Sequence, residues 1–156
     1  MKIDTVSIDH ANLAKELFLK GYNCSQAVAC AFSDLTGMDI DASARMASSF
    51  GGGIGRLRET CGVVSAAALV LGIVRGYDAP GDYEAKRRHY ALVREFADRF
   101  KAAENSISCR ELLTLAGLTV EVGNDPEQRR EEFYQKRPCP RLVYEAARIL
   151  EEMLKY

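Results

Sequence analysis

The chain has 156 residues, 47% of them hydrophobic and 28% charged, which is typical of one globular domain. Its 21 basic and 22 acidic side chains leave a net charge of −1, so the charge gives no sign of a nucleic-acid partner. The longest strongly apolar stretch, Val63–Val74, is too short for membrane insertion, and residues 1–10 do not resemble a secretion signal. Five cysteines are too few for a secreted disulfide scaffold. We therefore expect a single domain over residues 1–156 in the cytoplasm.

Helical patterns begin near the N-terminus and follow one another along the chain. The first helix is expected from about Ile8 to Lys20. The second follows the cap residue Asn23, has Cys24 in its first turn and continues to Gly37. A short third helix over about Asp41–Ser48 then leads into a glycine-rich run.

The fourth predicted helix is the most apolar one. Thr60 can cap this helix, with Cys61 immediately inside it. Because its side chains are apolar on nearly all sides, we expect a buried central helix over about residues 61–75. A long fifth helix over about residues 83–104 follows the cap residue Asp82.

The segment after the fifth helix is less regular. Ser108 can cap a short helix that begins at Cys109. Asp125-Pro126 is typical of a helix start and predicts a charged helix through Lys136. Residues 119–122 could instead form a short extended piece.

The last predicted helix has Cys139 at its N-cap, Pro140 at its first position and an apolar stripe that continues to Met153. No stretch alternates polar and apolar residues for long enough to indicate a sheet. The sequence therefore predicts an all-α fold, a multi-helix bundle.

Four of the five cysteines lie where a predicted helix begins: Cys24, Cys61, Cys109 and Cys139. A helix start has unpaired N–H groups and the positive end of the helix dipole, both of which favour the thiolate form. Intervals of 37, 48 and 30 residues separate these cysteines, so only folding could bring them together. Cys30 lies inside the second predicted helix, where we expect a structural role.

Three interpretations of the four thiols remain open at this point. They could pair reversibly as redox-active thiols and disulfides, or bind one metal centre as a zinc ion or an iron–sulfur cluster. They could also be buried, inert side chains. The chain has no Cys-x-x-Cys pair, which disfavours thioredoxin-like chemistry and most zinc ribbons.

A glycine-rich run with two arginines precedes the helix of Cys61: Gly51, Gly52, Gly53, Gly55, Arg56 and Arg58. Successive N–H groups of such a run can turn inward and form a cradle for an anion, a sulfur atom or a cofactor. The run is neither a P-loop nor a dinucleotide-binding fingerprint. The alternative is a flexible bend that lets two helices pack closely.

Five parts of the chain share their residues with one known family: Gly21–Val28, Phe50–Arg56, Thr60–Ser65, Cys109–Leu113 and Cys139. They resemble the C_GCAxxG_C_C family of redox-active proteins, which is named for four cysteines and a Cys-Gly-Ala-x-x-Gly motif. The similarity runs from about residue 14 to residue 150.

The resemblance implies that Cys24, Cys61, Cys109 and Cys139 are the four family cysteines and that they form a redox-active centre. The chain departs from the motif at two positions, where Val63 replaces alanine and Ala66 replaces glycine. Both changes add side-chain volume to the helix that follows Cys61.

We therefore expect an electron-transfer protein or oxidoreductase whose four thiols bind a metal ion or an iron–sulfur cluster, or cycle between thiol and disulfide. A partner oxidoreductase would supply or accept the electrons. The alternatives are a zinc-binding helical scaffold and a domain that binds a small anionic ligand through Gly51–Gly55. The sequence gives no indication of the oligomeric state.

Overall fold

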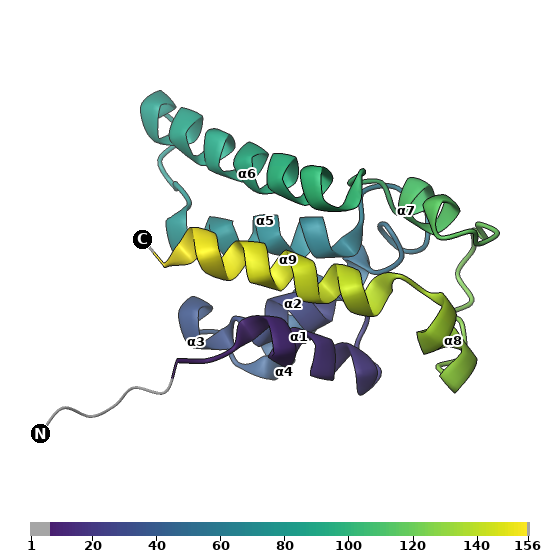
Figure 1. Ribbon diagram of the computed structural model, residues 1–156. Coiled ribbons are helices and arrows are strands. Elements are labelled where there is room, and N and C mark those ends of the chain that lie inside the picture. The colour runs from purple at the N-terminus through teal and green to yellow at the C-terminus, as the bar shows by residue number, and fades with distance from the viewer. Residues whose placement is uncertain (1–6, 156) are drawn as a thin grey trace, which may run out of the picture.

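The computed structural model describes residues 7–155, and every regular element in that range is helical (Figure 1). The elements are α1 (His10–Leu19), α2 (Cys24–Ala31), α3 (Ser33–Thr36), α4 (Ile40–Ala47), the 3-10 helix η1 (Ser48–Phe50), α5 (Gly62–Arg75), α6 (Tyr83–Glu104), α7 (Cys109–Leu115), α8 (Glu131–Lys136) and α9 (Cys139–Leu154). The predicted all-α fold is confirmed.

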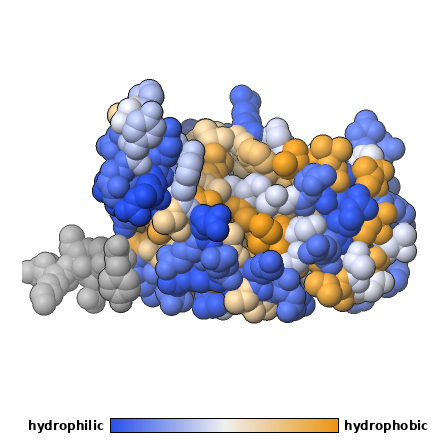
Figure 2. Space-filling model, turned by 90° about the horizontal axis from the view of Figure 1, so that it is seen from above, coloured by the Kyte–Doolittle hydropathy of each residue, from blue (hydrophilic) through white to orange (hydrophobic). Residues whose placement is uncertain are grey.

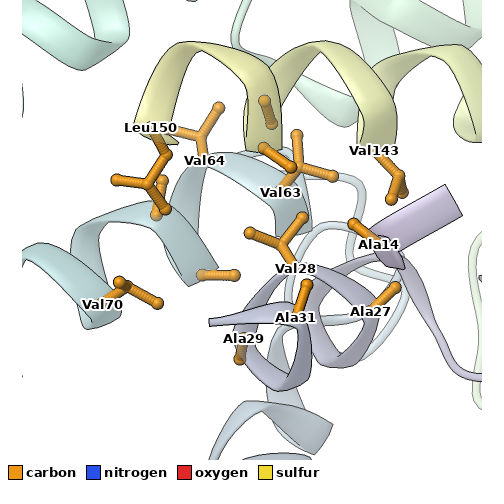
Figure 3. Packing of buried hydrophobic residues seen from close by; sticks show 14 of the residues in the cluster. Ala14, Ala27, Val28, Ala29, Ala31, Val63, Val64, Val70, Val143 and Leu150 are labelled. Carbon is orange, nitrogen blue, oxygen red and sulfur yellow. The ribbon is translucent and has the colours of Figure 1, made fainter. Parts of the chain in front are cut away.

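Helix α5 lies at the centre of the bundle, as predicted. It packs against α2 on one side and against α6 and α9 on the other, while α1 lies between α2 and α9 (Figure 1). Figure 3 shows Val63 of α5 between α9 and Val28 of α2, and Val64 of α5 beside Leu150 of α9. The buried residues of α5 lie between Gly62 and Leu71, whereas Ile73 near its end is 41% exposed.

Alanines line the contacts around α2 and allow neighbouring helices to approach closely. Ala27 and Ala31 of α2 and Ala14 of α1 are all essentially inaccessible to solvent (Figure 3). The N-terminal half of the bundle is joined to α9 through His10, whose two ring nitrogens lie 2.7 Å from a Glu151 carboxylate oxygen and 3.0 Å from Asp34.

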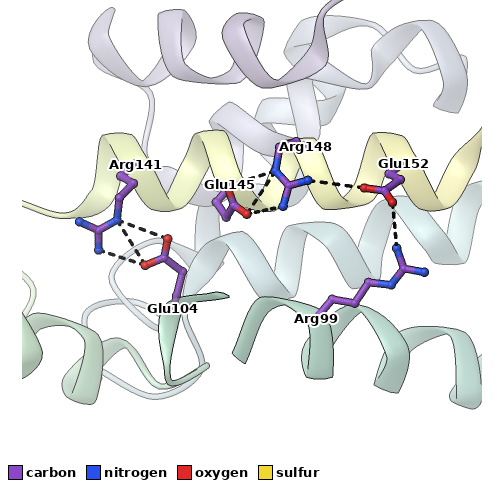
Figure 4. Close-up of polar contacts among 6 residues, drawn as sticks. All are labelled: Arg99, Glu104, Arg141, Glu145, Arg148 and Glu152. Atoms are coloured by element: carbon purple, nitrogen blue, oxygen red, sulfur yellow. Dashed lines mark hydrogen bonds and ion pairs between the residues drawn. The ribbon is translucent and has the colours of Figure 1, made fainter. Parts of the chain in front are cut away.

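The long helix α6 forms one outer layer, along the top of Figure 1. Only Phe96 and Phe100 on this helix are buried. Ion pairs join the side of α6 to α9, with Arg141 3.0 Å from Glu104 and Arg99 3.7 Å from Glu152 (Figure 4). Because at least one partner of each pair is exposed, the pairs stabilise the contact only modestly, and the two phenylalanines are its main anchor.

The surface seen from above mixes hydrophilic side chains with apolar ones that emerge between them (Figure 2). Among residues 7–155, no helix combines the length and the apolar character that crossing a membrane requires.

Several predicted boundaries differ from the structure. The second predicted helix is interrupted at Phe32 and continues as α3 before Gly37 ends it in a left-handed conformation. The charged helix predicted from Pro126 begins only at Glu131, and residues 119–122 belong to no strand. The segment 118–130 is therefore a loop without regular structure.

Candidate functional site

The four family cysteines lie at the starts of four different helices, as predicted. Cys24, Cys109 and Cys139 are the first residues of α2, α7 and α9. Cys61 is the N-cap of α5 rather than its first residue, which corrects the expected position by one residue. Likewise, Pro138 and not Cys139 caps α9.

Local side-chain bonds fix two of these helix starts. At α2, the Asn23 side chain accepts a hydrogen bond from the backbone N–H of Gln26, and the Gln26 side chain accepts one from the N–H of Asn23. At α7, the Ser108 hydroxyl accepts a hydrogen bond from the N–H of Glu111. Both caps place a cysteine directly inside the first turn.

A short backbone pairing holds the segments of Cys61 and Cys109 together. The N–H of Cys61 donates to the carbonyl of Ile107 over 2.7 Å, and the N–H of Cys109 donates to the carbonyl of Glu59 over the same distance. These bonds surround an isolated antiparallel bridge between Thr60 and Ser108. No pattern in the sequence predicts this pairing, because it is too short to show strand periodicity.

All four family cysteines line one cavity of about 380 Å³. Cys61 and Cys109 are buried, and Cys24 and Cys139 are partly exposed. Cys30 is outside the cavity, where it is buried inside α2 and its thiol donates to the carbonyl of Ile40. The fold thus brings together the cysteines that the sequence analysis grouped and leaves the fifth apart.

The glycine-rich run forms part of the cavity wall. Gly51, Gly52 and Gly55 line it, whereas Gly53 lies behind the wall. A Cβ atom on Gly53, whose φ is +71°, would lie 2.7 Å from the Cβ of Cys109. A side chain at position 53 would therefore displace this cysteine.

The loop after the glycines is conformationally strained. Ile54, Arg56 and Arg58 have φ values of +66°, +63° and +63°, a region that side chains other than glycine rarely adopt. A β-branched residue such as Ile54 is especially uncommon there. Such strain persists where surrounding contacts enforce it, and it is frequent in functional loops.

Burial dominates the acid–base behaviour of three of the thiols. It raises the pKa of Cys24, raises that of Cys61 well above its usual value and raises the pKa of Cys139 to about 12. The nearby thiols add to each increase, since a thiolate at one position disfavours a second. The thiol pKa is therefore not lowered at these helix starts, because desolvation outweighs the dipole.

Backbone N–H groups act in the opposite direction on two of these thiols. The N–H groups of Gly52 and Ser25 lower the pKa of Cys24, and that of Val63 lowers the pKa of Cys61. Gly52 is a member of the glycine-rich run, so one N–H group of the run is directed to a sulfur atom.

Four arginines line the same cavity: Arg56, Arg58, Arg129 and Arg137. Arg58 is 5% exposed, and its Nη1 lies 3.7 Å from the sulfur of Cys109. The guanidinium of Arg129 lies 4.3 Å from the ring centre of Phe18 and donates to two backbone carbonyls. Glu127 is the one acidic side chain on the described wall, so four positive charges face one negative charge.

Three residues of the cavity wall were not predicted from the sequence: Glu127, Arg129 and Arg137. They come from the irregular loop and the short helix after it, where no hydrophobic period or motif marks a residue as buried. Burial lowers the pKa of the Arg137 guanidinium, while the Cys139 sulfur raises it.

The sulfur atoms are not arranged around a single ion. Within residues 7–155, no three cysteine, histidine, aspartate or glutamate side chains are close enough together to hold one metal ion. One tetrahedral zinc ion has ligand sulfurs at about 2.3 Å and therefore about 3.8 Å from each other.

A family model described as "Putative redox-active protein (C_GCAxxG_C_C)" matches residues 22–153. The chain belongs to the C_GCAxxG_C_C family. The matched range includes the glycine-rich run and all four cysteines of the cavity. No curated protein and no solved structure matches the chain.

The two departures from the C_GCAxxG_C_C motif have different locations. Val63 lies on the cavity wall, so its larger side chain narrows the space next to Cys61. Ala66 is fully buried in the hydrophobic core and does not line the cavity. Only the first departure therefore changes the site directly.

Proposed function

We propose that this C_GCAxxG_C_C protein is an electron carrier in which Cys24, Cys61, Cys109 and Cys139 hold an iron–sulfur cluster. The observation that supports it best is the convergence of these four cysteines, from four separate helices, on one basic cavity. Four cysteine thiolates are the common ligand set of such clusters.

The charge of the cavity favours an anionic centre. Four thiolates are strongly negative, and a metal core neutralises only part of that charge. Four arginines on the wall and the positive ends of the helices that begin at the cysteines offset the remainder. Without an anionic centre, the positive charge of the four arginines would be balanced by only one carboxylate on the described wall, which is unfavourable for partly buried charges.

The raised thiol pKa values favour metal binding over thiol–disulfide exchange. Exchange requires a thiolate as the attacking group, and burial keeps Cys24, Cys61 and Cys139 protonated at neutral pH. A bound metal, in contrast, displaces the thiol protons itself.

The described side chains count against a single bound metal ion. One zinc ion would require the four sulfur atoms to meet at a single point, and the described side chains form no such group. In a cluster the cysteines bind different iron atoms, so the four sulfur atoms need not meet at a single point.

When bound, a cluster supplies reversible one-electron transfer. The residues of this chain have two tasks around it. The apolar wall, including Val63, Leu112 and Leu142, limits access of water. Arg58 and the N–H of Gly52 are directed toward sulfur atoms, where positive charge and hydrogen bonds favour the reduced form. A partner oxidoreductase would then exchange the electrons, and we infer a reducing, cytoplasmic setting.

The proposal is tested on protein purified without oxygen, by iron and acid-labile sulfide analysis and by visible spectra before and after dithionite. We expect iron with sulfide and a visible band that dithionite bleaches. Cys61→Ser should abolish this band, whereas Cys30→Ser, a buried cysteine outside the cavity, should leave it intact.

Three outcomes would overturn the proposal. Protein that takes up no iron even after anaerobic reconstitution has no cluster, and its thiols would then be tested for reversible disulfides. One zinc ion without iron or sulfide would support a structural scaffold. Equal loss of the band in Cys30→Ser and Cys61→Ser would show that the four ligands are wrongly chosen.

A further inference from the structure

Three arginines of the cavity surround a single carboxylate. Arg137 Nη2 donates a hydrogen bond to the Glu127 carboxylate, and the Nη2 atoms of Arg56 and Arg58 each lie 3.9 Å from the same oxygen. Within residues 7–155, no other carboxylate lies within 4 Å of these three guanidinium groups. The group therefore has a charge of +3 against −1.

The arrangement differs from an ordinary surface ion pair because the arginine side chains are much less exposed than the carboxylate. The side chains of Arg56, Arg58 and Arg137 are 16%, 5% and 11% exposed, whereas that of Glu127 is 34% exposed. Buried charges are unfavourable unless they are paired and hydrogen-bonded. One partly exposed carboxylate leaves a net charge of +2 in this group.

The guanidinium donors of Arg56 and Arg58 that make no hydrogen bond within residues 7–155 are both directed toward the Glu127 carboxylate. Arg56 bonds the carbonyls of Gly123 and Asp125 through Nη1, and Arg58 bonds the carbonyl of Glu121 through Nε. In the described structure the Nη2 groups of both arginines have no acceptor within hydrogen-bond distance, and both face the Glu127 oxygen. Their backbone bonds fix the guanidinium planes and leave these donors free for an oxygen atom.

We propose that Arg56, Arg58 and Arg137 form a binding site for a small oxyanion of charge −2, and that the Glu127 side chain occupies this site until the oxyanion displaces it. Guanidinium groups have planar forks of N–H donors that match the oxygen atoms of phosphate-like and carboxylate anions. With Glu127 displaced, a dianion lowers the charge of the three-arginine group from +3 to +1, whereas the Glu127 carboxylate lowers it only to +2.

The proposed oxyanion site lies next to two of the four cysteines. Arg58 reaches both the Glu127 carboxylate and the sulfur of Cys109, and Arg137 is two residues from Cys139. An oxyanion at the three arginines would therefore lie on the wall of the cysteine cavity. This inference goes beyond the proposed electron carriage and holds whether or not the cysteines bind a cluster.

The test is isothermal titration calorimetry of inorganic phosphate into the full-length protein, with chloride keeping the ionic strength constant. Glu127→Gln removes the competing charge and keeps the size of the side chain. We expect this variant to bind phosphate at least about tenfold more tightly than the wild type, since a charge-assisted hydrogen bond no longer competes. If phosphate binding to the wild type is too weak to detect, measurable binding to Glu127→Gln would also confirm this expectation.

Glu121→Gln is the matched control, because Glu121 lies on the same loop, is exposed and contacts Arg58 only through its carbonyl. It removes the same charge and should bind phosphate as the wild type does. Adding Arg137→Gln to Glu127→Gln should abolish the gain, with circular dichroism showing that each variant is folded.

The inference is overturned if Glu127→Gln binds no phosphate or binds it no more tightly than Glu121→Gln. A similar gain in both variants would indicate a general charge effect and would also overturn it. Iron and sulfide content is measured on the same samples, so failure of phosphate binding and failure of the cluster proposal are separate results.

Discussion

Gly62 is a residue at which the site should tolerate a side chain poorly. It is the first residue of α5, directly after Cys61. A Cβ atom at this position would lie 2.6 Å from the sulfur of Cys24 and 2.8 Å from the carbonyl oxygen of Phe50. Both distances are shorter than van der Waals contact, so in Gly62→Ala either the thiol or the η1 backbone must move.

The expected cost follows from these contacts. Overpacking a buried site by one methyl group costs about 1–3 kcal/mol of unfolding free energy. The higher helix propensity of alanine returns at most about 1 kcal/mol. We therefore expect Gly62→Ala to lose about 1–2 kcal/mol, which corresponds to a decrease in Tm of roughly 2–8 °C for a chain of this size.

The assay is thermal unfolding followed by circular dichroism, with Gly72→Ala as the matched control. Gly72 lies in the same helix, is exposed, and a Cβ atom there would meet nothing within 4 Å. This control should raise the stability by up to about 1 kcal/mol. If Gly62→Ala were as stable as the wild type while Gly72→Ala behaved as expected, the close approach of α5 to Cys24 would be refuted.

Two further predictions concern the cavity wall. With a pKa of about 12, the Cys139 thiol of metal-stripped protein should be almost entirely protonated at pH 8. Because the thiolate reacts, its alkylation rate, followed by mass spectrometry, should still rise about tenfold per pH unit from pH 8 to pH 10, and a plateau near pH 9 would contradict the effect of burial. Arg129→Ala removes a guanidinium that stacks on Phe18 and donates to the carbonyls of Phe18 and Tyr22. It should lower the unfolding free energy by about 2–3 kcal/mol in urea denaturation, whereas Arg130→Ala at the exposed neighbouring position should change it by less than about 0.5 kcal/mol.

The helix starts could be predicted because their signals are local. Asn23, Asp82 and Ser108 each cap a helix in the structure, as their short polar side chains indicated. The apolar run of α5 also identified the central helix, since a helix that is apolar all round has to be buried. These features require only a few neighbouring residues.

Other features depend on contacts between distant segments. The break at Phe32 follows no glycine or proline; its ring is fully buried and stacks at 4.3 Å on His10, from another helix. The arginines of the cavity have no local signature either, because Arg56 and Arg58 are held by carbonyl groups more than sixty residues away. A guanidinium group that donates to backbone carbonyls needs no particular residue type as its partner. Such a contact therefore cannot be recognised in the sequence.

The same contrast explains why helix starts did not lower the thiol pKa values. The dipole argument considers one thiol at one helix end, where a positive potential favours the thiolate. The fold instead buries three of these thiols next to one another, and desolvation and mutual repulsion then favour the protonated form. The arginines and helix ends can stabilise negative charge in this cavity only once a cation has displaced the protons. Binding of a metal centre should therefore release protons and become tighter as pH rises. Because the arginines of the wall stabilise thiolates, they favour the metal-bound protein over the protein with free, protonated thiols.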